Sequence, residues 1–567
     1  GTTGEDKIRR ARVLAQGTLE ALRAYNYYPS IIQTNEWPSW LVAALMTTWK
    51  EYRDDPHFAQ TKVGSMMHNP HPSYGITLNE ANPVKRNYYC NVLGLDPRFH
   101  YDLAVNRYSP NGHQIDLMHT MLRSSHFIGT VSRAMKERML KETWLFDHVW
   151  EFAEKERLGM FFARRNGFNM AARQRFWFGT KKSLVETWQP SARRRLFYKY
   201  YAAKKTAKLD LQNNPYIRLT PDSESLDHVI FGMLHRISKQ KGFELLVDWK
   251  VYTDGPNRYV RHETWNMNGN TVLEHFLQSN PRIQFVICGR VEDSPDGRRY
   301  DAHLRRIASR PDMAGRFAYY PEGNLSPDLY RNLYVGCQYF VMPSGGEVGE
   351  PCGISQQEAH AGGTPVIAHH QDGLQHTVSD NDFGDKDYPA NGIKFTGFSG
   401  EGLLEAMLDA VEIYYHGRRR LYRDANGKPK PLDYDDLVFH AFTRDHRWIK
   451  PLRDYIDMFA KVLGTALPVH LDALRLIEEI AYTEDGETGD VLLKYGLSTE
   501  QAILSLIAAM GCDVASVRRA AARTLVRLAQ TLKNPFLSEA LKQIRQAMDS
   551  LDKNQTRLLE WCMENMA

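Results

Sequence analysis

The sequence predicts an α/β protein in which two mainly parallel sheets are followed by an all-helical extension. Short apolar runs, typical of strands buried on both faces, alternate with segments whose apolar residues recur every three or four positions. This alternation occurs twice, before and after a polar segment at residues 213–222 that looks like a linker. From about residue 466 onward only the helical spacing remains. Such alternation favours parallel strands covered by helices.

Composition excludes several classes of protein. The chain has 567 residues, which at roughly 150 residues per domain predicts two to four domains. A hydrophobic fraction of 43% and a charged fraction of 25% exclude a wholly disordered chain. No apolar run reaches the roughly 18 residues of a membrane span. The six cysteines form no CxxC pair, so we expect reduced thiols in a cytoplasmic protein.

The first series of elements follows from apolar periodicity. Apolar residues at helical spacing predict a helix over 7–24, and the pair Ile31-Ile32 predicts a short buried strand. Ser132 follows a strand and is a plausible N-cap for the helix after it. The other elements expected here are a helix over 39–50, a strand ending at His68, a helix over 116–124 and a strand over 127–131.

The second series has four apolar runs, each followed by a polar or glycine-bearing loop. They predict parallel strands at 228–233, 284–289, 339–343 and 365–368. In open parallel sheets the loops at the carboxyl ends of the strands carry the ligand site. Residues 251–275 are expected to form a surface insertion.

A basic and aromatic block covers residues 164–208. It contains thirteen Lys and Arg residues and Glu186 as its only acid, and interleaved aromatic residues that include Phe176, Trp177, Phe178, Phe197, Tyr198, Tyr200 and Tyr201. Interleaved cations and rings suit RNA or another polyanion, which is one alternative function. A solvated or protein-docking face, with the rings in the core, explains the same pattern. The net charge of +5 is too modest to decide between them.

Two clusters could carry chemistry. The loop 235–242 places cations at a strand-to-helix turn, where a phosphate would bind. The segment 343–359 reads as strand end, glycine-rich loop and helix, and the amides at its helix start would point at an anion. Glu350 and Glu358 would lie about 12 Å apart on a helix. A retaining hydrolase needs its two carboxylates at about 5 Å, so we expect two separate hydrogen-bonding roles.

These residues resemble the motifs of bacterial and plant glycogen and starch synthases, which are retaining glucosyltransferases of GT-B architecture. Arg236 and Lys241, followed by Gly242, match the R-x4-K motif of that family, and Glu350 and Glu358 match its E-x7-E spacing. The remaining matches, in chain order over roughly residues 10–460, are Asn35-Glu36-Trp37, His68-Asn69, Asn166-Gly167-Phe168-Asn169, Glu350-Pro351-Cys352-Gly353, Gly363-Thr364-Pro365-Val366, Asp372–Val378 and Asp445-His446-Arg447-Trp448 through Tyr455.

The resemblance implies two Rossmann-like domains that face each other across a cleft. The implied divisions are an acceptor-side domain (1–222), a nucleotide-sugar domain (223–435), a crossover helix back to the first domain (436–465) and a helical extension (466–567). The family's K-x-G-G-L loop is not found, so the first domain is expected to lack its opening strands. The chain would then be the downstream part of a longer polypeptide, depend on a partner for the missing part, or be an inactive scaffold.

The resemblance also implies the reaction and the residues. Glucose would move from ADP-glucose or UDP-glucose to the end of an α-glucan, with cationic side chains in place of a metal. Glu350 would hold sugar hydroxyls, His68 would lie over the transferred glucose, and Glu358 would bind the ribose. Arg236 and Lys241 would stabilise the leaving diphosphate. Further donor-binding residues would be Gly353, Ile354, Ser355 and Asn166, with Tyr319 or Tyr320 stacking on the base.

Two other residue patterns are expected to have no catalytic or metal-binding role. Cys352 has no histidine placed beside it by the sequence, so packing next to the glycine-rich loop is favoured over a nucleophilic role. His369-His370 has no second ligand pair nearby and indicates a polar strand end, and no metal or other cofactor is expected.

Overall fold

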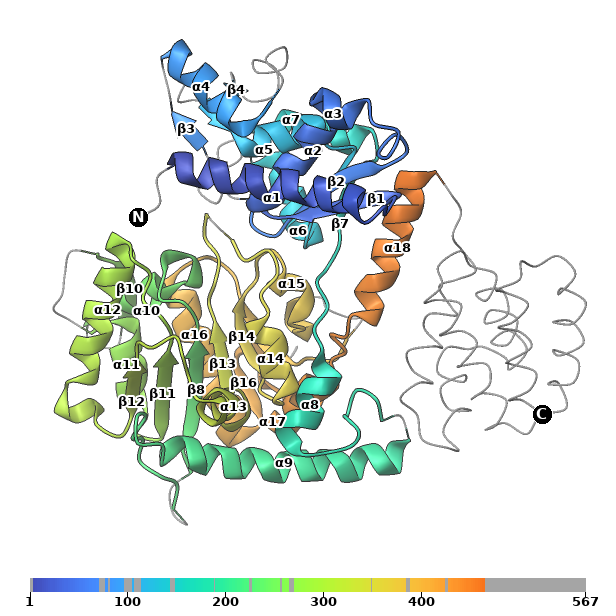
Figure 1. Cartoon of the computed structure of the whole chain (residues 1–567). Helices are drawn as coiled ribbons and strands as arrows, with labels where there is room; N and C mark the ends of the chain where they lie inside the picture. Colours follow the sequence, from blue (N-terminus) through green and yellow to red (C-terminus); the bar gives the residue numbers. More distant parts are fainter. Residues whose placement is uncertain are drawn as a thin grey trace, which may run out of the picture. The chain divides into compact units, whose positions relative to one another are not determined.

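The computed structural model describes most of residues 4–464 (Figure 1). The described ranges are 4–70, 77–79, 82–95, 105–106, 114–142, 148–187, 189–223, 227–254, 257–264, 270–347, 349–383, 388–423 and 427–464. The predicted helical extension 466–567 lies outside them. The chain divides into two compact units, residues 1–181 with 197–446 and residues 182–196 with 447–567, and each is described by itself.

The first sheet of the larger unit has four parallel strands in the order β1-β2-β6-β7. These strands are β1 (Ile31–Asn35), β2 (Lys62–Met67), β6 (Phe127–Thr130) and β7 (Phe161–Ala163). The helices around it are α1 (Gly4–Ala24), α2 (Leu41–Thr48), α3 (Lys50–Arg53), α4 (Pro83–Leu93), α5 (Leu117–Ser124), α6 (Arg133–Lys141) and α7 (Val149–Arg157). A small antiparallel sheet combines β3 (Thr77–Asn79), β5 (Gln114–Asp116) and β4 (Val105–Asn106).

Local sequence explains several of these elements. The predicted first helix is confirmed as α1, whose apolar stripe of Ile8, Ala11, Ala15 and Leu19 is buried in the core of this sheet. The Ser132 side chain accepts a hydrogen bond from an amide of α6, which confirms it as the N-cap. These caps and stripes fix the helix ends without long-range contacts.

Two expectations for this sheet were wrong in detail. Ile31 and Ile32 are only partly buried, because β1 is an edge strand that pairs with β2 alone. The helix expected over 39–50 is interrupted at Trp49, whose backbone is extended, so α2 and α3 are separate helices after the short 3-10 turn Trp37–Ser39.

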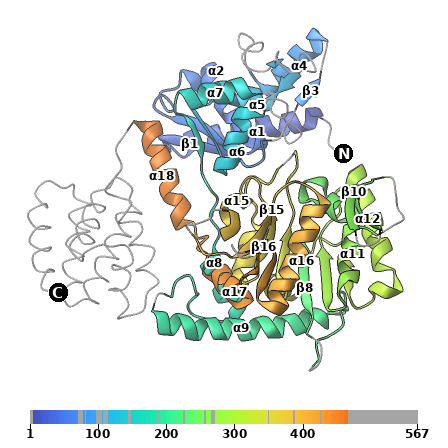
Figure 2. The same ribbon diagram turned by 180° about the vertical axis from the view of Figure 1, so that it is seen from behind.

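The second sheet has six parallel strands in the order β12-β11-β8-β13-β14-β15. Its strands are β8 (Val229–Leu234), β11 (Ile283–Cys288), β12 (Phe317–Tyr320), β13 (Tyr339–Met342), β14 (Val366–His369) and β15 (Gly392–Phe395). The four predicted strands are confirmed as β8, β11, β13 and β14, and the sequence analysis missed the two edge strands. The helices α13 and α14 lie on one face of the sheet and α16 on the other (Figure 2).

Further elements complete this part of the chain. The helices are α10 (Phe243–Val247), α11 (Val272–Ser279), α12 (Pro295–Ala308), α13 (Pro327–Gly336), α14 (Ser355–Ala361), α15 (Leu374–Thr377), α16 (Gly400–His416) and α17 (Tyr434–Thr443). Antiparallel pairs join β9 (Trp249–Asp254) to β10 (Asn257–His262) and β16 (Arg418–Arg423) to β17 (Pro429–Pro431). The expected insertion 251–275 therefore contains most of a hairpin and the start of α11.

The basic block forms α8 (Met170–Phe178) and the long helix α9 (Pro190–Gln212). The Lys204 ammonium is buried and donates to the carbonyls of Val335 and Cys337 at 2.7 and 2.6 Å. The Phe178 and Tyr200 rings stack with centroids 4.0 Å apart. The sequence analysis placed this segment in the first domain (1–222), whereas these bonds attach α9 to the second sheet.

The smaller unit is described through α18 (Ile449–Leu463), which falls within the range predicted for the crossover helix. It ends at Gly464, whose positive φ of 67° is the left-handed conformation that commonly ends helices. Among the helices described, none combines the length and the apolar character needed to cross a membrane.

Candidate active site

Two loops at the carboxyl ends of β8 and β13 approach each other closely. Gly242 has φ +74°, and a Cβ there would lie 2.4 Å from the carbonyl oxygen of Pro343. The Gln240 side chain donates to the carbonyl of Gly349 at 3.1 Å, and the Gly345 amide donates to the carbonyl of Gln240 at 3.3 Å. Glycine at position 242 therefore allows the cationic loop and the glycine-rich loop to pack as one unit.

Lys241 and Glu350 form an ion pair between these loops. Their side chains are only 16% and 7% exposed. The sequence analysis named both as catalytic, and the structure brings them into direct contact. A carboxylate held by one ammonium still has lone pairs to accept hydrogen bonds from a ligand's hydroxyl groups.

The backbone of Glu350 is fixed by Asp372. The Glu350 amide donates to Oδ2 of Asp372 at 3.0 Å, and the same oxygen accepts from Arg138 at 2.9 Å. Burial raises the pKa of Asp372, and the Arg138 guanidinium and the Glu350 amide partly oppose that rise. Asp372 adopts φ +48°, unusual for a residue other than glycine, and a Cβ at Gly349 would lie 2.0 Å from its Oδ2.

The sequence analysis missed the part played by these two residues. Asp372 stood in a quoted motif without a role. Arg138, on α6, gave no signal because its partner lies 234 positions further along the chain. A polar residue at a positive φ is a recurrent mark of functional loops, but φ is not visible in a sequence.

Arg236 lies at a more open position than Lys241. Its side chain is half exposed, and its guanidinium donates to Glu292 at 3.1 Å and to Gln240 at 3.3 Å. Because Gln240 also bonds to the glycine-rich loop, Arg236 borders the same loop pair.

The predicted anion-binding amides lie at the start of α14. The N-cap residue Ile354 has no side chain that caps the helix, and it is 51% exposed. A Cβ at Gly353 would lie 2.2 Å from the terminal methyl group of Met342, so a side chain there would require Met342 to shift. The amide of Ser355, at the first position of the helix, is among those that helices leave without an intrahelical partner.

Glu358, on α14, has partners of its own. One carboxylate oxygen accepts from Arg173 at 2.8 Å, and the other accepts from the hydroxyl of Tyr330. Burial and the Glu358 charge raise the pKa of Tyr330, so this hydroxyl stays protonated and donates. The sequence analysis did not identify either partner.

His68 lies at the end of β2 in a second polar cluster. Its Nδ1 is 3.0 Å from the side-chain amide nitrogen Nδ2 of Asn166, and its Nε2 is 3.2 Å from Oδ1 of Asn35. The Glu36 carboxylate accepts from the backbone amides of His68 and Asn69. Burial lowers the pKa of His68, so the imidazole is neutral near pH 7. Asn35 and Glu36, the first two residues of the quoted motif, thus position His68.

Cys352 connects the two clusters. The backbone of Asn166 interacts with its thiol, and Glu350 acts on the same thiol electrostatically. Burial dominates and raises the pKa of Cys352 to about 11, so the thiol is neutral. This agrees with the prediction of packing rather than nucleophilic attack, and it associates Asn166, bonded to His68, with the Glu350 loop.

The two tyrosines predicted to stack on the base have other partners. The Tyr319 hydroxyl donates to Asp301 at 2.7 Å, and the Tyr320 ring lies 5.5 Å from that of Tyr216. No hydrogen bond recorded for the described residues joins either tyrosine to Glu350. His369, for which the sequence predicts a polar strand end rather than a metal ligand, is the last residue of β14, and its ring lies 5.3 Å from that of Phe395.

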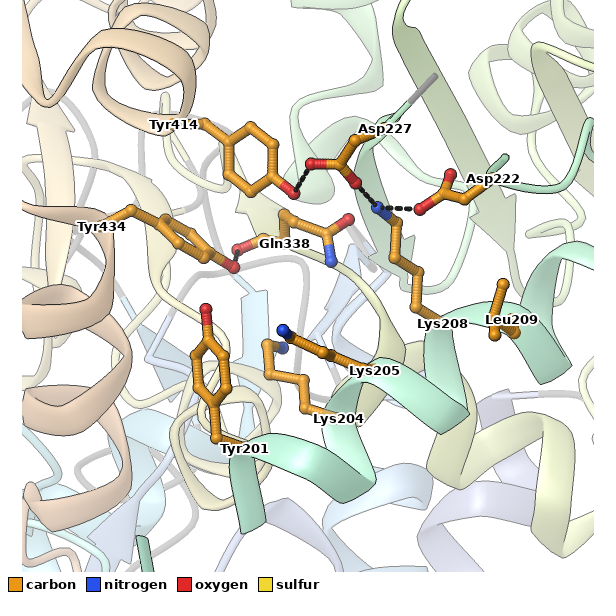
Figure 3. Close-up of a pocket in the computed structure, with 10 residues that line it drawn as sticks. All are labelled: Tyr201, Lys204, Lys205, Lys208, Leu209, Asp222, Asp227, Gln338, Tyr414 and Tyr434. Carbon is orange, nitrogen blue, oxygen red and sulfur yellow. Dashed lines mark hydrogen bonds and ion pairs between the residues drawn. The ribbon is translucent and has the colours of Figure 1, made fainter. Parts of the chain in front are cut away.

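A separate cavity of about 410 Å³ lies beside α9 (Figure 3). It is lined by Tyr201, Lys204, Lys205, Lys208, Leu209, Asp222, Asp227, Gln338, Tyr414 and Tyr434. Gln338 directly precedes β13, so the cavity lies at the amino ends of the strands, opposite Glu350. Lys208 pairs with Asp222 at 2.6 Å and with Asp227 at 2.7 Å. Because part of its charge is neutralised in this way, the basic block does not favour the polyanion alternative.

Comparisons with known proteins agree with this geometry. Residues 2–148 match the family model of the starch synthase catalytic domain, and residues 260–425 match that of glycosyl transferases group 1. The glycogen synthase of Fervidobacterium nodosum is 24% identical over 465 residues, covering 81% of this chain and 76% of that protein. The glycogen synthase of Thermotoga maritima is 22% identical over 470 residues, with 81% and 77% covered.

A solved structure shows the same fold. The catalytic domain of starch synthase IV from Arabidopsis thaliana, bound to ADP and acarbose, superposes with a TM-score of 0.58 at 18% identity, covering 82% of this chain and 78% of that one. The two parallel sheets are therefore those of a GT-B fold. With matches to both family models and to glycogen synthases along four fifths of its length, the chain is a glycosyltransferase that is similar to the glycogen and starch synthases.

Proposed function

We propose that the protein transfers glucose from ADP-glucose or UDP-glucose to the end of an α-glucan, with retention of configuration and without a metal. The observation that carries the proposal is the buried Lys241–Glu350 pair at the carboxyl ends of β8 and β13. There a cation and a carboxylate stand side by side, one suited to a diphosphate and the other to sugar hydroxyls.

The proposed step breaks the bond between the anomeric carbon and the diphosphate oxygen. Negative charge gathers on the leaving group, where Lys241, Arg236 and the first amides of α14 stabilise it. The acceptor hydroxyl attacks from the face that the diphosphate leaves. Its oxygen bonds to the anomeric carbon, and its proton passes to the departing phosphate oxygen. Retention then needs no nucleophile from the protein.

The other polar groups hold the donor. The second oxygen of Glu350 accepts from glucose hydroxyls while Asp372 keeps its backbone in place. His68, neutral and oriented by Asn166, bonds to the transferred glucose through its ring or its backbone. Glu358 accepts from the ribose hydroxyls, exchanging one of its present partners. Base stacking by Tyr319 or Tyr320 requires a rearrangement of their present contacts.

The direct test combines nucleotide binding with glucose transfer. Calorimetric titration with ADP and UDP should give one-site binding to one or both. Labelled glucose should pass from the matching donor to an α-glucan primer. Glu350→Ala should abolish transfer and keep much of the nucleotide affinity. Glu347→Ala is the matched control, because its side chain lies in the same loop and is 63% exposed.

Three results would contradict the proposal. If the folded chain binds neither ADP nor UDP, the proposed glucosyltransferase function is wrong. Transfer by Glu350→Ala at the rate of Glu347→Ala would show that the loop is misassigned. Nucleotide binding without any transfer would favour an inactive or partner-dependent scaffold.

A further inference from the structure

Four titratable side chains lie close together between helices that surround the first sheet, away from the loop that carries Glu350. Asp116 and His119 come from the start of α5, and His148 and Glu151 from the start of α7. The four residues are 6%, 4%, 4% and 7% exposed. Figure 1 shows the two helices side by side. Ionisable side chains are rarely buried to this degree unless they pair with each other or coordinate a metal.

Their polar atoms converge. Nδ1 of His119 lies 3.0 Å from Oε1 of Glu151, and Nε2 of His148 lies 2.8 Å from Oδ2 of Asp116. One ligand atom each of His119, His148 and Glu151 lie within 4.8 Å of one another. The contact between His119 and Glu151 is short, but its angles are not those of a hydrogen bond. Among the described residues, Nδ1 of His119 therefore has no hydrogen-bond partner.

The composition of the cluster fits a cation. Two carboxyl groups and two imidazoles face one another in a buried site, and a divalent cation there would be held by carboxylate oxygen and imidazole nitrogen.

We propose that this cluster binds one divalent transition metal of borderline softness, with Zn²⁺ the best fit. His119, His148 and Glu151 are the ligands, and Asp116 orients His148 through its second ring nitrogen. Two imidazole nitrogens and a carboxylate oxygen form a ligand set typical of zinc, whereas Mg²⁺ and Ca²⁺ prefer oxygen alone. Histidine ligands commonly donate their other N–H to a carboxylate, as His148 does to Asp116.

The required movement is small. Zinc–ligand distances of about 2.0–2.2 Å place tetrahedral ligand atoms about 3.4 Å apart. The separation of 3.0 Å already lies near that value, and no pair of the three ligand atoms exceeds 4.8 Å. A water molecule would complete the tetrahedron. The metal would then tie α5 to α7 and have a structural role.

The signature of the site does not depend on glucosyl transfer. Histidine and carboxylate side chains must be deprotonated to bind a metal, so binding should weaken as the solution is acidified. The experiment uses the whole chain after treatment with a chelator. Co²⁺ serves as the probe, because tetrahedral Co²⁺ absorbs strongly in the visible range and Zn²⁺ should displace it.

The expected result is one Co²⁺ per chain and a visible spectrum of the tetrahedral type, both lost when Zn²⁺ is added. Glu151→Gln and His119→Gln should lose the spectrum. Asp116→Asn should weaken binding by about 10–100-fold, as removal of an outer-shell partner does. Asparagine remains a good N-cap, so this variant keeps the start of α5.

Matched controls distinguish this site from surface binding. Glu154→Gln changes an exposed residue of the same helix, and His126→Gln removes a histidine that bonds to the backbone of Val63 instead. Both should retain the spectrum. Lack of stoichiometric binding by the wild-type chain, folded by circular dichroism, would overturn the proposal. So would a wild-type spectrum in folded Glu151→Gln. If the ligand variants unfold, a wild-type Co²⁺ spectrum of the octahedral type would also overturn it.

Discussion

Replacing Lys241 by methionine should damage both stability and transfer, and the two effects can be separated. The methionine keeps most of the volume but leaves the Glu350 carboxylate, 7% exposed, without its cation. Removing one partner of a buried ion pair costs about 3–5 kcal/mol. Because the Lys241 side chain is 16% exposed and water can reach the carboxylate, we expect the lower end, about 3 kcal/mol.

A second variant tests whether that cost comes from the unpaired charge. Lys241→Met combined with Glu350→Gln has no charge to leave unpaired, so its Tm should recover most of the loss seen in Lys241→Met alone. Transfer should not recover, because the leaving diphosphate still lacks its cation. Loss of such a stabilising group costs about 10²–10³-fold in kcat.

The assays are thermal unfolding followed by fluorescence and single-turnover transfer of labelled glucose. Lys239→Met is the matched control, because Lys239 belongs to the same loop, is 51% exposed and lies 3.9 Å from Glu347. Equal Tm losses in the single and double variants would refute the charge argument. A wild-type kcat in Lys241→Met would refute the role assigned to the ammonium.

The other predictions concern residues around the same loops and the long helix. Asp372→Asn keeps the left-handed backbone but loses a charge-assisted bond worth about 1.5–3 kcal/mol, so kcat should fall about 10–100-fold with little change in the Kd for nucleotide. Glu358→Gln should do the reverse, weakening nucleotide binding in calorimetry by about tenfold or more while the maximal rate changes little. His68→Gln should leave the Tm within about 1 °C and lower transfer, and an unchanged rate would argue against its place over the glucose. Burial lowers the pKa of Lys204 to about 7, far below that of the unfolded chain, so the unfolded state binds more protons between pH 7 and 10 and stability should rise with pH in that window. The Tm of Lys204→Met should rise less between pH 7 and 10 than the Tm of the wild type. If the Tm of both proteins changes with pH in the same way, the lowered pKa of Lys204 is wrong.

Local signals in the sequence predicted the parts of the fold that local physics determines. The apolar stripe of α1 and the cap at Ser132 depend on residues a few positions apart, and the four central strands of the second sheet are apolar runs of four to six residues, almost wholly buried. The edge strands β12 and β15 were missed, and in β15 the buried Lys394 interrupts the short apolar run. The position of β1 at an edge depends on which strands pair, and no single segment specifies that.

The candidate site divides in the same way. Lys241 and Glu350 lie in glycine-bearing loops after apolar strands, a pattern that a sequence displays directly. Arg138 and Arg173 stand among many similar cations, and their partners are 234 and 185 positions away. Their importance comes from the tertiary fold, which brings helices of the first half of the chain to Asp372 and to α14 in the second.

Both carboxylate oxygens of Glu358 accept hydrogen bonds within the protein, one from Arg173 and the other from Tyr330. If Glu358 binds the ribose as proposed, the nucleotide must displace one of these hydrogen bonds. A ribose has two hydroxyl groups with which to replace it, whereas a 2′-deoxyribose has only one. On the proposed function, the paired state of Glu358 would then favour ribonucleotides over 2′-deoxyribonucleotides.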